Sequence, residues 1–206
     1  MSSPTDAVPA DDAPRRRVAP FVALGAAVLA IAMFWVLATA SSGSTDASGL
    51  VDSHLLGRPA PALETATLDG GRFDLARRKG SWVVLNFFQS TCVPCKAEHP
   101  ELVAFATQQR AIGLAGAELY TVVQYDDEPD RVRAFFAERG GDWPVLLDEN
   151  GRVFVSFGVA QVPETFVIDP DGVVRLRWAG PIDAVTLAQV VQQQRDLYDF
   201  GAAVGQ

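Results

Sequence analysis

The sequence predicts an α/β fold in which a mixed β-sheet has helices packed on both faces. Three observations indicate this class. Short apolar runs of strand-like composition alternate with segments of helical spacing along most of the chain. One of these runs, residues 82–88, is typical of a strand buried on both faces in the middle of a sheet. Turn signals at residues 69–71 and 169–172 indicate two hairpins, whose strands pair antiparallel.

The 206-residue chain is long enough for one folded domain with appendages, and its hydrophobic content of 49% is enough for a core. The formal net charge of −8 argues against a nucleic-acid surface, because no basic stripe is present to neutralise phosphates. The chain has two cysteines, Cys92 and Cys95. A disulfide framework needs more cysteines at wider spacing, so these two are not expected to be structural staples.

The N-terminal part has the composition of a tail followed by a membrane anchor. Residues 1–20 are rich in Pro, Ala, Asp and Ser, which predicts a disordered tail. Residues 21–40 contain no charged side chain and are long enough to cross a bilayer as a helix. Arginines at positions 15–17 precede this segment and none follows it closely. This predicts a single-pass anchor in the cell membrane, with a cytoplasmic N-terminus and an exported remainder.

A cleaved signal peptide is the alternative interpretation, because Ala38-Thr39-Ala40 has the small residues of a cleavage site. The apolar core of a signal peptide is about 7–15 residues long, which is shorter than this segment and favours the anchor. Residues 41–54 begin with a Ser/Gly/Thr-rich stretch and predict a flexible linker. We then expect the folded domain over residues 55–198 and a short tail over residues 199–206.

The first half of the domain is expected to run from a hairpin through the central strand to a helix. Its strands are predicted, from apolar content and turn signals, at residues 63–68, 72–75, 82–88 and 119–124. A polar turn, Gln89-Ser90-Thr91, ends the central strand. The helix begins just after this turn and continues to about Arg110.

The second half begins with a helix at residues 129–139, in which Val132, Phe135 and Phe136 have helical spacing and a Gly-Gly pair provides the stop. The remaining elements are, in order, a short strand at 145–147, a short helix or turn at 152–157, hairpin strands at 165–168 and 173–178, and a last helix capped by Asp183.

The motif Cys92-Val93-Pro94-Cys95 places two thiols three residues apart at the start of the predicted helix. Unpaired backbone N–H groups and the helix dipole favour a thiolate on the first sulfur. Pro94 suits this place, because the first helical turn does not need its N–H. We interpret the pair as a dithiol–disulfide redox centre, with Cys92 as the attacking thiolate, Cys95 as the resolving partner and no other cofactor.

Three other uses of the cysteines are less consistent with the sequence. A permanent disulfide would close almost no loop and would therefore add little stability. A zinc site formed with His99 lacks an obvious fourth ligand. Haem attachment requires a histidine directly after the second cysteine, where this chain has Lys96.

Two blocks of sequence resemble a known family. The first is V-V-L-N-F-F-Q-S-T-C-V-P-C-K-A-E-H-P at residues 83–100, which ends in a proline five residues after the second cysteine. The second is G-V-A-Q-V-P-E-T-F-V-I-D-P-D-G-V-V-R-L-R-W-A-G at residues 158–180. Together they are similar to thioredoxin-fold proteins of the membrane-anchored TlpA/ResA/CcmG (DsbE) type, over roughly residues 55–195.

This resemblance implies a thioredoxin-like domain held outside the cytoplasmic membrane, where it reduces disulfides of exported proteins. The best-known substrate of the family is apocytochrome c, which links it to cytochrome c maturation. A reductant in an oxidising compartment needs electrons, and the resemblance implies a membrane dithiol carrier such as CcdA or DsbD as their source. Two departures from thioredoxin concern the site: Thr91 replaces a tryptophan before the first cysteine, and Asn86 replaces a buried aspartate.

Further site residues follow from the resemblance and from spacing. Glu98 lies three residues past Cys95 on the same helix face, where a partly buried carboxylate could shuttle the proton of that thiol; a solvated glutamate is the alternative. The resemblance implies a cis bond between Val162 and Pro163, facing the dithiol and exposing backbone to an incoming peptide. Glu164 then reads the substrate or tunes the cysteines, unless it is an ordinary edge-strand charge.

The residues between the cysteines bear on the direction of electron flow. Val93 and Pro94 offer no cation to stabilise the thiolate, whereas strong oxidants of the DsbA type have a histidine there. We therefore expect a reductase. A general exported oxidase or isomerase and a redox-inert binding module on the same scaffold are alternatives. A peroxidase fits less well, because no arginine lies next to Cys92.

Overall fold

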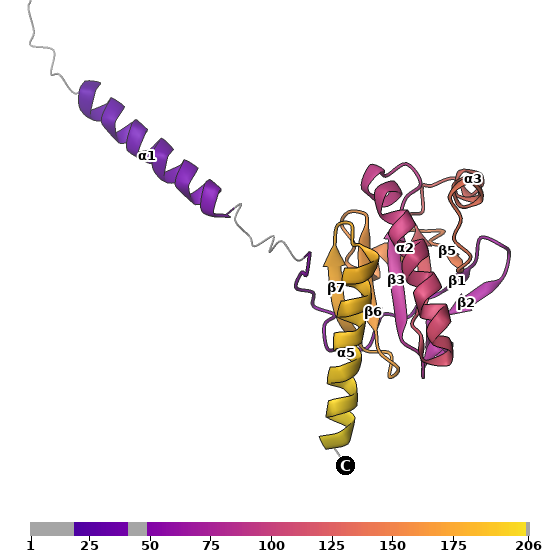
Figure 1. Ribbon diagram of the computed structural model, residues 1–206. Helices are drawn as coiled ribbons and strands as arrows, with labels where there is room; N and C mark the ends of the chain where they lie inside the picture. The colour runs from indigo at the N-terminus through magenta and orange to yellow at the C-terminus, as the bar shows by residue number, and fades with distance from the viewer. Residues whose placement is uncertain (1–18, 41–48, 205–206) are drawn as a thin grey trace, which may run out of the picture. The chain divides into compact units, whose positions relative to one another are not determined.

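A computed structural model describes residues 19–40 and 49–204 of the chain (Figure 1). Within these ranges, side chains are described for residues 23–35 and 49–204. Nearly all of the predicted N-terminal tail, and residues 41–48 of the predicted linker, lie outside the described residues.

The chain divides into two units, residues 1–44 and 45–206. The first unit contains helix α1, Ala19–Ala40, at the position where the sequence predicts a transmembrane helix. Its described side chains are exposed. Among the residues whose side chains are described, 23–35 and 49–204, no helix is both long enough and apolar enough to span a bilayer.

The second unit is built on a five-stranded sheet with the strand order β5-β4-β3-β6-β7. Its strands are β3 (Val83–Phe88), β4 (Glu118–Val123), β5 (Val145–Leu147), β6 (Glu164–Ile168) and β7 (Val174–Ala179). β3, β4 and β5 pair in parallel, whereas β6 is antiparallel to both β3 and β7. This arrangement confirms the predicted mixed sheet, with the predicted central strand in its middle.

A second sheet contains two short antiparallel strands, β1 (Glu64–Ala66) and β2 (Arg72–Asp74). Both are shorter than the segments predicted for them. An isolated bridge between Thr67 and Leu146 connects this hairpin to the β5 edge of the main sheet.

Helices lie on both faces of the main sheet, as predicted. The helical elements of this unit are η1 (Leu75–Arg78), α2 (Val93–Ile112), η2 (Gly113–Ala115), α3 (Pro129–Arg139), α4 (Arg152–Phe157) and α5 (Ala184–Val204). Helices α2 and α5 lie side by side and share one hydrophobic cluster with the sheet (Figure 1). Helix α4 contributes to the cluster on the opposite face.

The side chains of β3 explain why this strand is apolar on both faces. Val83, Leu85 and Phe87 belong to the cluster that contains α4, whereas Val84 belongs to the cluster that contains α2 and α5. All four are buried. Burying each such side chain contributes roughly 1.5–3 kcal/mol. The strand is therefore fixed in the sheet directly before the cysteines.

The folded domain is longer than the sequence predicts at both ends. Leu50, in the predicted linker, already bridges to Trp178 of β7. Helix α5 continues past residue 198 to Val204, and Tyr198 packs edge-on against Trp82 with ring centroids 5.8 Å apart. Trp82, Trp143 and Trp178 belong to the core, since all three are buried.

Candidate active site

The two cysteines lie at the start of α2, just after the turn that follows β3. Cys92 is the N-cap residue of α2, and its Sγ accepts a hydrogen bond of 3.1 Å from the backbone N–H of Cys95. Cys92 and Cys95 form a disulfide. Cys95 is buried, whereas Cys92 is partly exposed. The first sulfur is thus the one that a partner can reach, and a helix N-terminus faces it.

The loop before β6 lies next to the disulfide. The Val162–Pro163 bond is cis, as the resemblance implies. The carbonyl oxygen of Val162 lies 3.6 Å from Cys92 Sγ. The structure therefore brings the predicted site residues Cys92 and Cys95 together with Val162 and Pro163. The backbone carbonyl of Val162 lies beside the accessible sulfur of Cys92.

Glu98 is buried behind the cysteines, so the alternative of a solvated glutamate is wrong. Its Oε1 accepts a hydrogen bond of 3.1 Å from the Ile182 N–H, and its Oε2 accepts one of 3.2 Å from Asn86 Nδ2. Burial disfavours the charged carboxylate and outweighs these two bonds, which raises the pKa of Glu98 from 4.5 to about 7. A carboxyl group of this kind can accept or release a proton at neutral pH, one helical turn after Cys95.

Asn86 connects Glu98 to the neighbouring strand. Its Nδ2 also donates to Thr165 Oγ1 of β6 at 3.2 Å. Within the described part of the chain, Asn86 Oδ1 is buried and has no hydrogen-bond partner. Rotation of the amide would present this oxygen to Glu98 when the carboxyl is protonated. The network can therefore accommodate both protonation states of Glu98.

Glu164 occupies an interior strand, so the alternative of an edge-strand charge is wrong. Its buried carboxylate pairs with Arg177 Nε of β7 at 2.8 Å and accepts a weak hydrogen bond of 3.4 Å from the Ala160 N–H. Arg177 Nη2 donates in turn to the carbonyl of Gly158 at 3.1 Å. Both carboxylate oxygens are engaged within the chain, which favours a role in holding the loop that carries Val162.

His99 packs in the interior of the domain. Its Nε2 lies 2.9 Å from the carbonyl oxygen of Gly140, and its ring contacts Phe135, Phe136 and Trp143. Burial lowers the pKa of His99, because the charged imidazolium would be poorly solvated there. The ring is therefore engaged with α3 and the segment after it.

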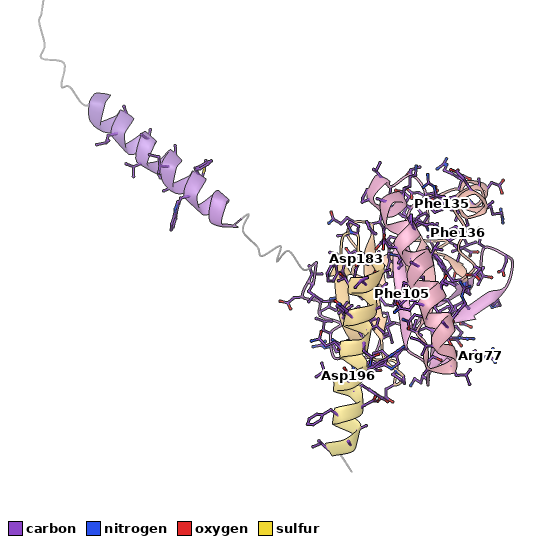
Figure 2. The ribbon with its side chains drawn as sticks, in the orientation of Figure 1. Arg77, Phe105, Phe135, Phe136, Asp183 and Asp196 are labelled. Carbon is purple, nitrogen blue, oxygen red and sulfur yellow. A yellow bond between two sulfur atoms is a disulfide. The ribbon has the colours of Figure 1, made fainter. Side chains whose placement is uncertain are left out.

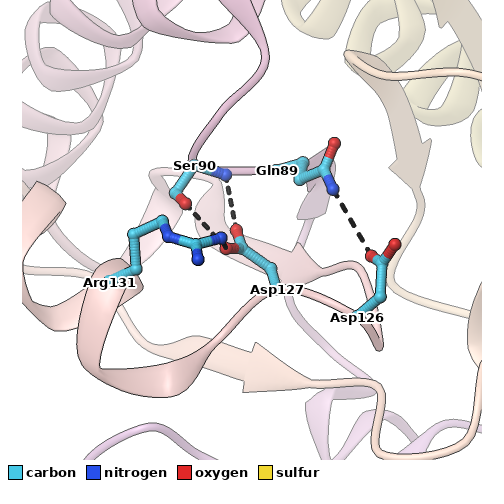
Figure 3. Close-up of polar contacts among 5 residues, drawn as sticks. All are labelled: Gln89, Ser90, Asp126, Asp127 and Arg131. Carbon is cyan, nitrogen blue, oxygen red and sulfur yellow. Dashed lines mark hydrogen bonds and ion pairs between the residues drawn. The ribbon is translucent and has the colours of Figure 1, made fainter.

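Sequence reasoning missed a contact that holds the turn in front of Cys92. The carboxylate of Asp127, in the loop after β4, accepts hydrogen bonds from both the N–H and the hydroxyl of Ser90 (Figure 3). Gln89 donates to the adjacent Asp126 at 3.4 Å. One signal was present: these aspartates follow a strand parallel to β3, and the carboxyl ends of parallel strands meet at one edge of a sheet.

The comparisons with known proteins agree with this geometry. The family model described as the AhpC/TSA family matches residues 56–177, which is more than half of the chain. The chain belongs to this family. Thiol:disulfide interchange protein HelX of Rhodobacter capsulatus is 36% identical over 137 residues, which cover 64% of this chain and 73% of that protein.

Two further proteins that the chain matches carry the name DsbE. Thiol:disulfide interchange protein DsbE of Escherichia coli is 29% identical over 180 residues, covering 85% of this chain and 91% of that protein. A Chlorobium tepidum structure that carries the DsbE name matches with a TM-score of 0.59 and 26% identity, covering 68% of this chain and 96% of that one. This AhpC/TSA-family protein is accordingly a thiol-disulfide oxidoreductase with a thioredoxin-like fold.

Proposed function

We propose that this protein is a membrane-anchored, extracytoplasmic disulfide reductase that serves cytochrome c maturation. The observation that carries the proposal is the partly exposed Cys92 at the N-terminus of α2, with the Val162 carbonyl beside it and Glu98 buried behind it. Relatives named thiol:disulfide interchange protein HelX and DsbE support the same reaction. The substrates are disulfides of exported proteins, with apocytochrome c as the leading candidate.

The reaction begins on the reduced protein. The Cys92 thiolate attacks one sulfur of the substrate disulfide, a mixed disulfide forms, and the other substrate sulfur leaves as a thiolate that takes up a proton. Cys95 then attacks Cys92 Sγ, so that the second substrate sulfur leaves and the Cys92–Cys95 disulfide forms. Two electrons pass from the protein to the substrate. Glu98 takes the proton that the buried Cys95 thiol must lose before it attacks.

The loop before β6 holds the substrate. An extended substrate segment pairs with the backbone of Val162, which the cis bond to Pro163 presents beside Cys92. Glu164 keeps this loop in place through Arg177 and Ala160. The side chain of Glu164 therefore acts on substrate binding through the loop.

Electrons return to the disulfide from a membrane dithiol carrier of the CcdA or DsbD type. Val93 and Pro94 supply no cationic group that would stabilise the reduced protein, which favours a reductant over a DsbA-type oxidant. The uncharged segment at residues 21–40 anchors the protein, and the three arginines before it keep the N-terminus in the cytoplasm.

Trapping of mixed disulfides tests this function. In the full-length Cys95→Ser variant the second step is blocked, so captured proteins stay attached to Cys92 and can be identified by mass spectrometry. Recovery of apocytochrome c supports the proposal. A broad set of unrelated exported proteins would instead indicate a general oxidase or isomerase. The variant that lacks both cysteines is the control for capture that does not involve a disulfide.

A further inference from the structure

The turn at residues 89–91 directly precedes Cys92. It is hydrogen-bonded to the loop between β4 and α3. The buried N–H of Ser90 donates to Asp127 Oδ2 at 2.5 Å, and the Ser90 hydroxyl donates to Asp127 Oδ1 at 2.7 Å (Figure 3). The turn is closed by a backbone bond of 3.1 Å from Cys92 N–H to the Gln89 carbonyl. The position of Cys92 thus depends on a residue far away in the sequence.

Asp127 is buried in the interior of the domain. Its side chain is fully buried, and Arg131 Nη1, from the first turn of α3, lies 3.5 Å from Oδ1. Its own N–H donates to the Gln124 carbonyl at 3.0 Å, and the Gln124 N–H donates to the carbonyl of Phe88 at 3.0 Å. The loop that carries the carboxylate is therefore tied to the end of β3, where the turn begins.

We propose that Asp127 is a positioning residue for the reactive sulfur. It fixes the turn so that Cys92 Sγ stays within 3.1 Å of the Cys95 N–H at the N-terminus of α2. A thiolate is stabilised there only if it remains close to the backbone donors of the first turn. The proposal rests on the proposed role of Cys92 as the attacking sulfur. It assigns the loop between β4 and α3 a part in making this sulfur reactive.

Asp127 has two physical effects on the Cys92 thiolate, and they have opposite signs. Holding the turn stabilises the thiolate, whereas a negative charge nearby destabilises it. Arg131 lies against the same carboxylate and offsets part of its charge. We therefore assign the larger effect to geometry.

Substitutions at Asp127 separate the two effects. Asp127→Asn removes the charge but keeps an oxygen that can accept from the Ser90 N–H, whereas Asp127→Ala removes both. Each variant is prepared as the reduced full-length protein. Alkylation by iodoacetamide is then followed separately at Cys92 and Cys95, across pH, by mass spectrometry.

A role in positioning predicts that Asp127→Ala moves the midpoint of Cys92 alkylation to higher pH and lowers its rate at neutral pH. A midpoint higher by one pH unit would lower the thiolate fraction roughly tenfold. Asp127→Asn should stay close to the wild type. The proposal is overturned if the folded Asp127→Ala protein alkylates like the wild type, or if both variants shift the midpoint to lower pH, which is the signature of the charge.

Two controls keep the test independent of stability and of the proposed function. Asp148 is also buried and accepts a backbone N–H bond, from Phe154 at 3.0 Å, so Asp148→Ala should cost stability without moving the Cys92 midpoint. Should Asp127→Ala fail to fold, Ser90→Ala takes its place, because it removes the hydroxyl that donates to Asp127. Ser90→Ala must then shift the midpoint of Cys92 alkylation to higher pH by a smaller amount, and Ser90→Thr, which keeps the hydroxyl, must retain the wild-type midpoint. No shift in Ser90→Ala overturns the proposal. Wild-type protein that alkylates first at Cys95 would contradict the assignment of Cys92 itself.

Discussion

At the scale of single residues, Glu98 has the surroundings that matter most for proton transfer. Spacing alone placed it on the same helix face as Cys95, but it did not show how deeply the carboxyl is buried. The segment before α5 lies against this carboxyl, and its Ile182 N–H donates a hydrogen bond of 3.1 Å to Glu98 Oε1. Such a contact joins positions far apart in sequence, and no local pattern predicts it.

The raised pKa of Glu98 makes the stability of the protein depend on pH. The folded protein binds the Glu98 proton more tightly than the unfolded chain, whose value is near 4.5, and releases it near 7. Between these values the folded state holds more protons, so the free energy of unfolding falls as pH rises through this window. At about 1.4 kcal/mol per unit, the total loss from this group is on the order of 3 kcal/mol.

Denaturant unfolding of the wild type and of Glu98→Gln between pH 4.5 and 7 measures this contribution. The decline assigned to Glu98 should disappear in the variant, because glutamine does not titrate. Glu138→Gln, at an exposed position, serves as the control and should keep the wild-type slope. Equal slopes in the wild type and Glu98→Gln would contradict the raised pKa.

The ion pair between Glu164 and Arg177 gives a second prediction at this scale. Glu164→Ala leaves a largely buried guanidinium without its partner, so we expect the free energy of unfolding to fall by about 3 kcal/mol. The matched control is Glu64→Ala, which breaks an exposed pair with Arg72 at 3.9 Å and should change stability by less than about 1 kcal/mol. Urea unfolding of both variants measures the difference, and equal losses would contradict the assigned burial.

At the scale of elements, the sequence predicted the active-site strand and helix well. The apolar run and the polar turn after it located β3, and the motif with Pro94 located the start of α2. The end of α5 was less predictable. Its last turns are anchored by Tyr198 against Trp82 and by Arg195, which donates to Gln109 at 3.3 Å, and both contacts reach across the fold.

The packing of α2 gives a prediction for this scale. Phe105 lies on α2, beside α5, and is fully buried (Figure 2). Phe105→Ala should lower the free energy of unfolding by roughly 3–5 kcal/mol, because it leaves a cavity in this cluster. Phe200 on α5 is 69% exposed, so Phe200→Ala should change stability by no more than about 0.5 kcal/mol. Thermal unfolding of both variants is the check, and a small effect at Phe105 would contradict the packing described.

At the scale of the whole molecule, the alternation of strands and helices was enough to predict a mixed sheet with helices on both faces. The order β5-β4-β3-β6-β7 brings the cysteine turn, the loop before Pro163 and the loop after β4 to one place. The first two were predicted to meet because both blocks resemble a known family. Asp127 was not, since its role depends on a pairing with Ser90 that only the folded chain displays.

The proposed anchor is tested on the whole chain. We expect the full-length protein to fractionate with membranes and to resist extraction by alkaline carbonate, because residues 21–40 are uncharged and long enough to span a bilayer. A variant without residues 1–40, exported by an unrelated signal peptide, should be found in the soluble fraction. N-terminal sequencing of the mature protein distinguishes the alternative: a chain that begins at Ser41 would show that the segment is cleaved.

The central claim is that Cys92 is the attacking sulfur because it lies at the N-terminus of α2 and within reach of a partner. Site-resolved alkylation of the reduced, full-length wild-type protein at neutral pH tests it most directly. We predict that Cys92 is modified first and that the buried Cys95 is protected. Faster modification of Cys95, or no modification of either thiol, would contradict the account.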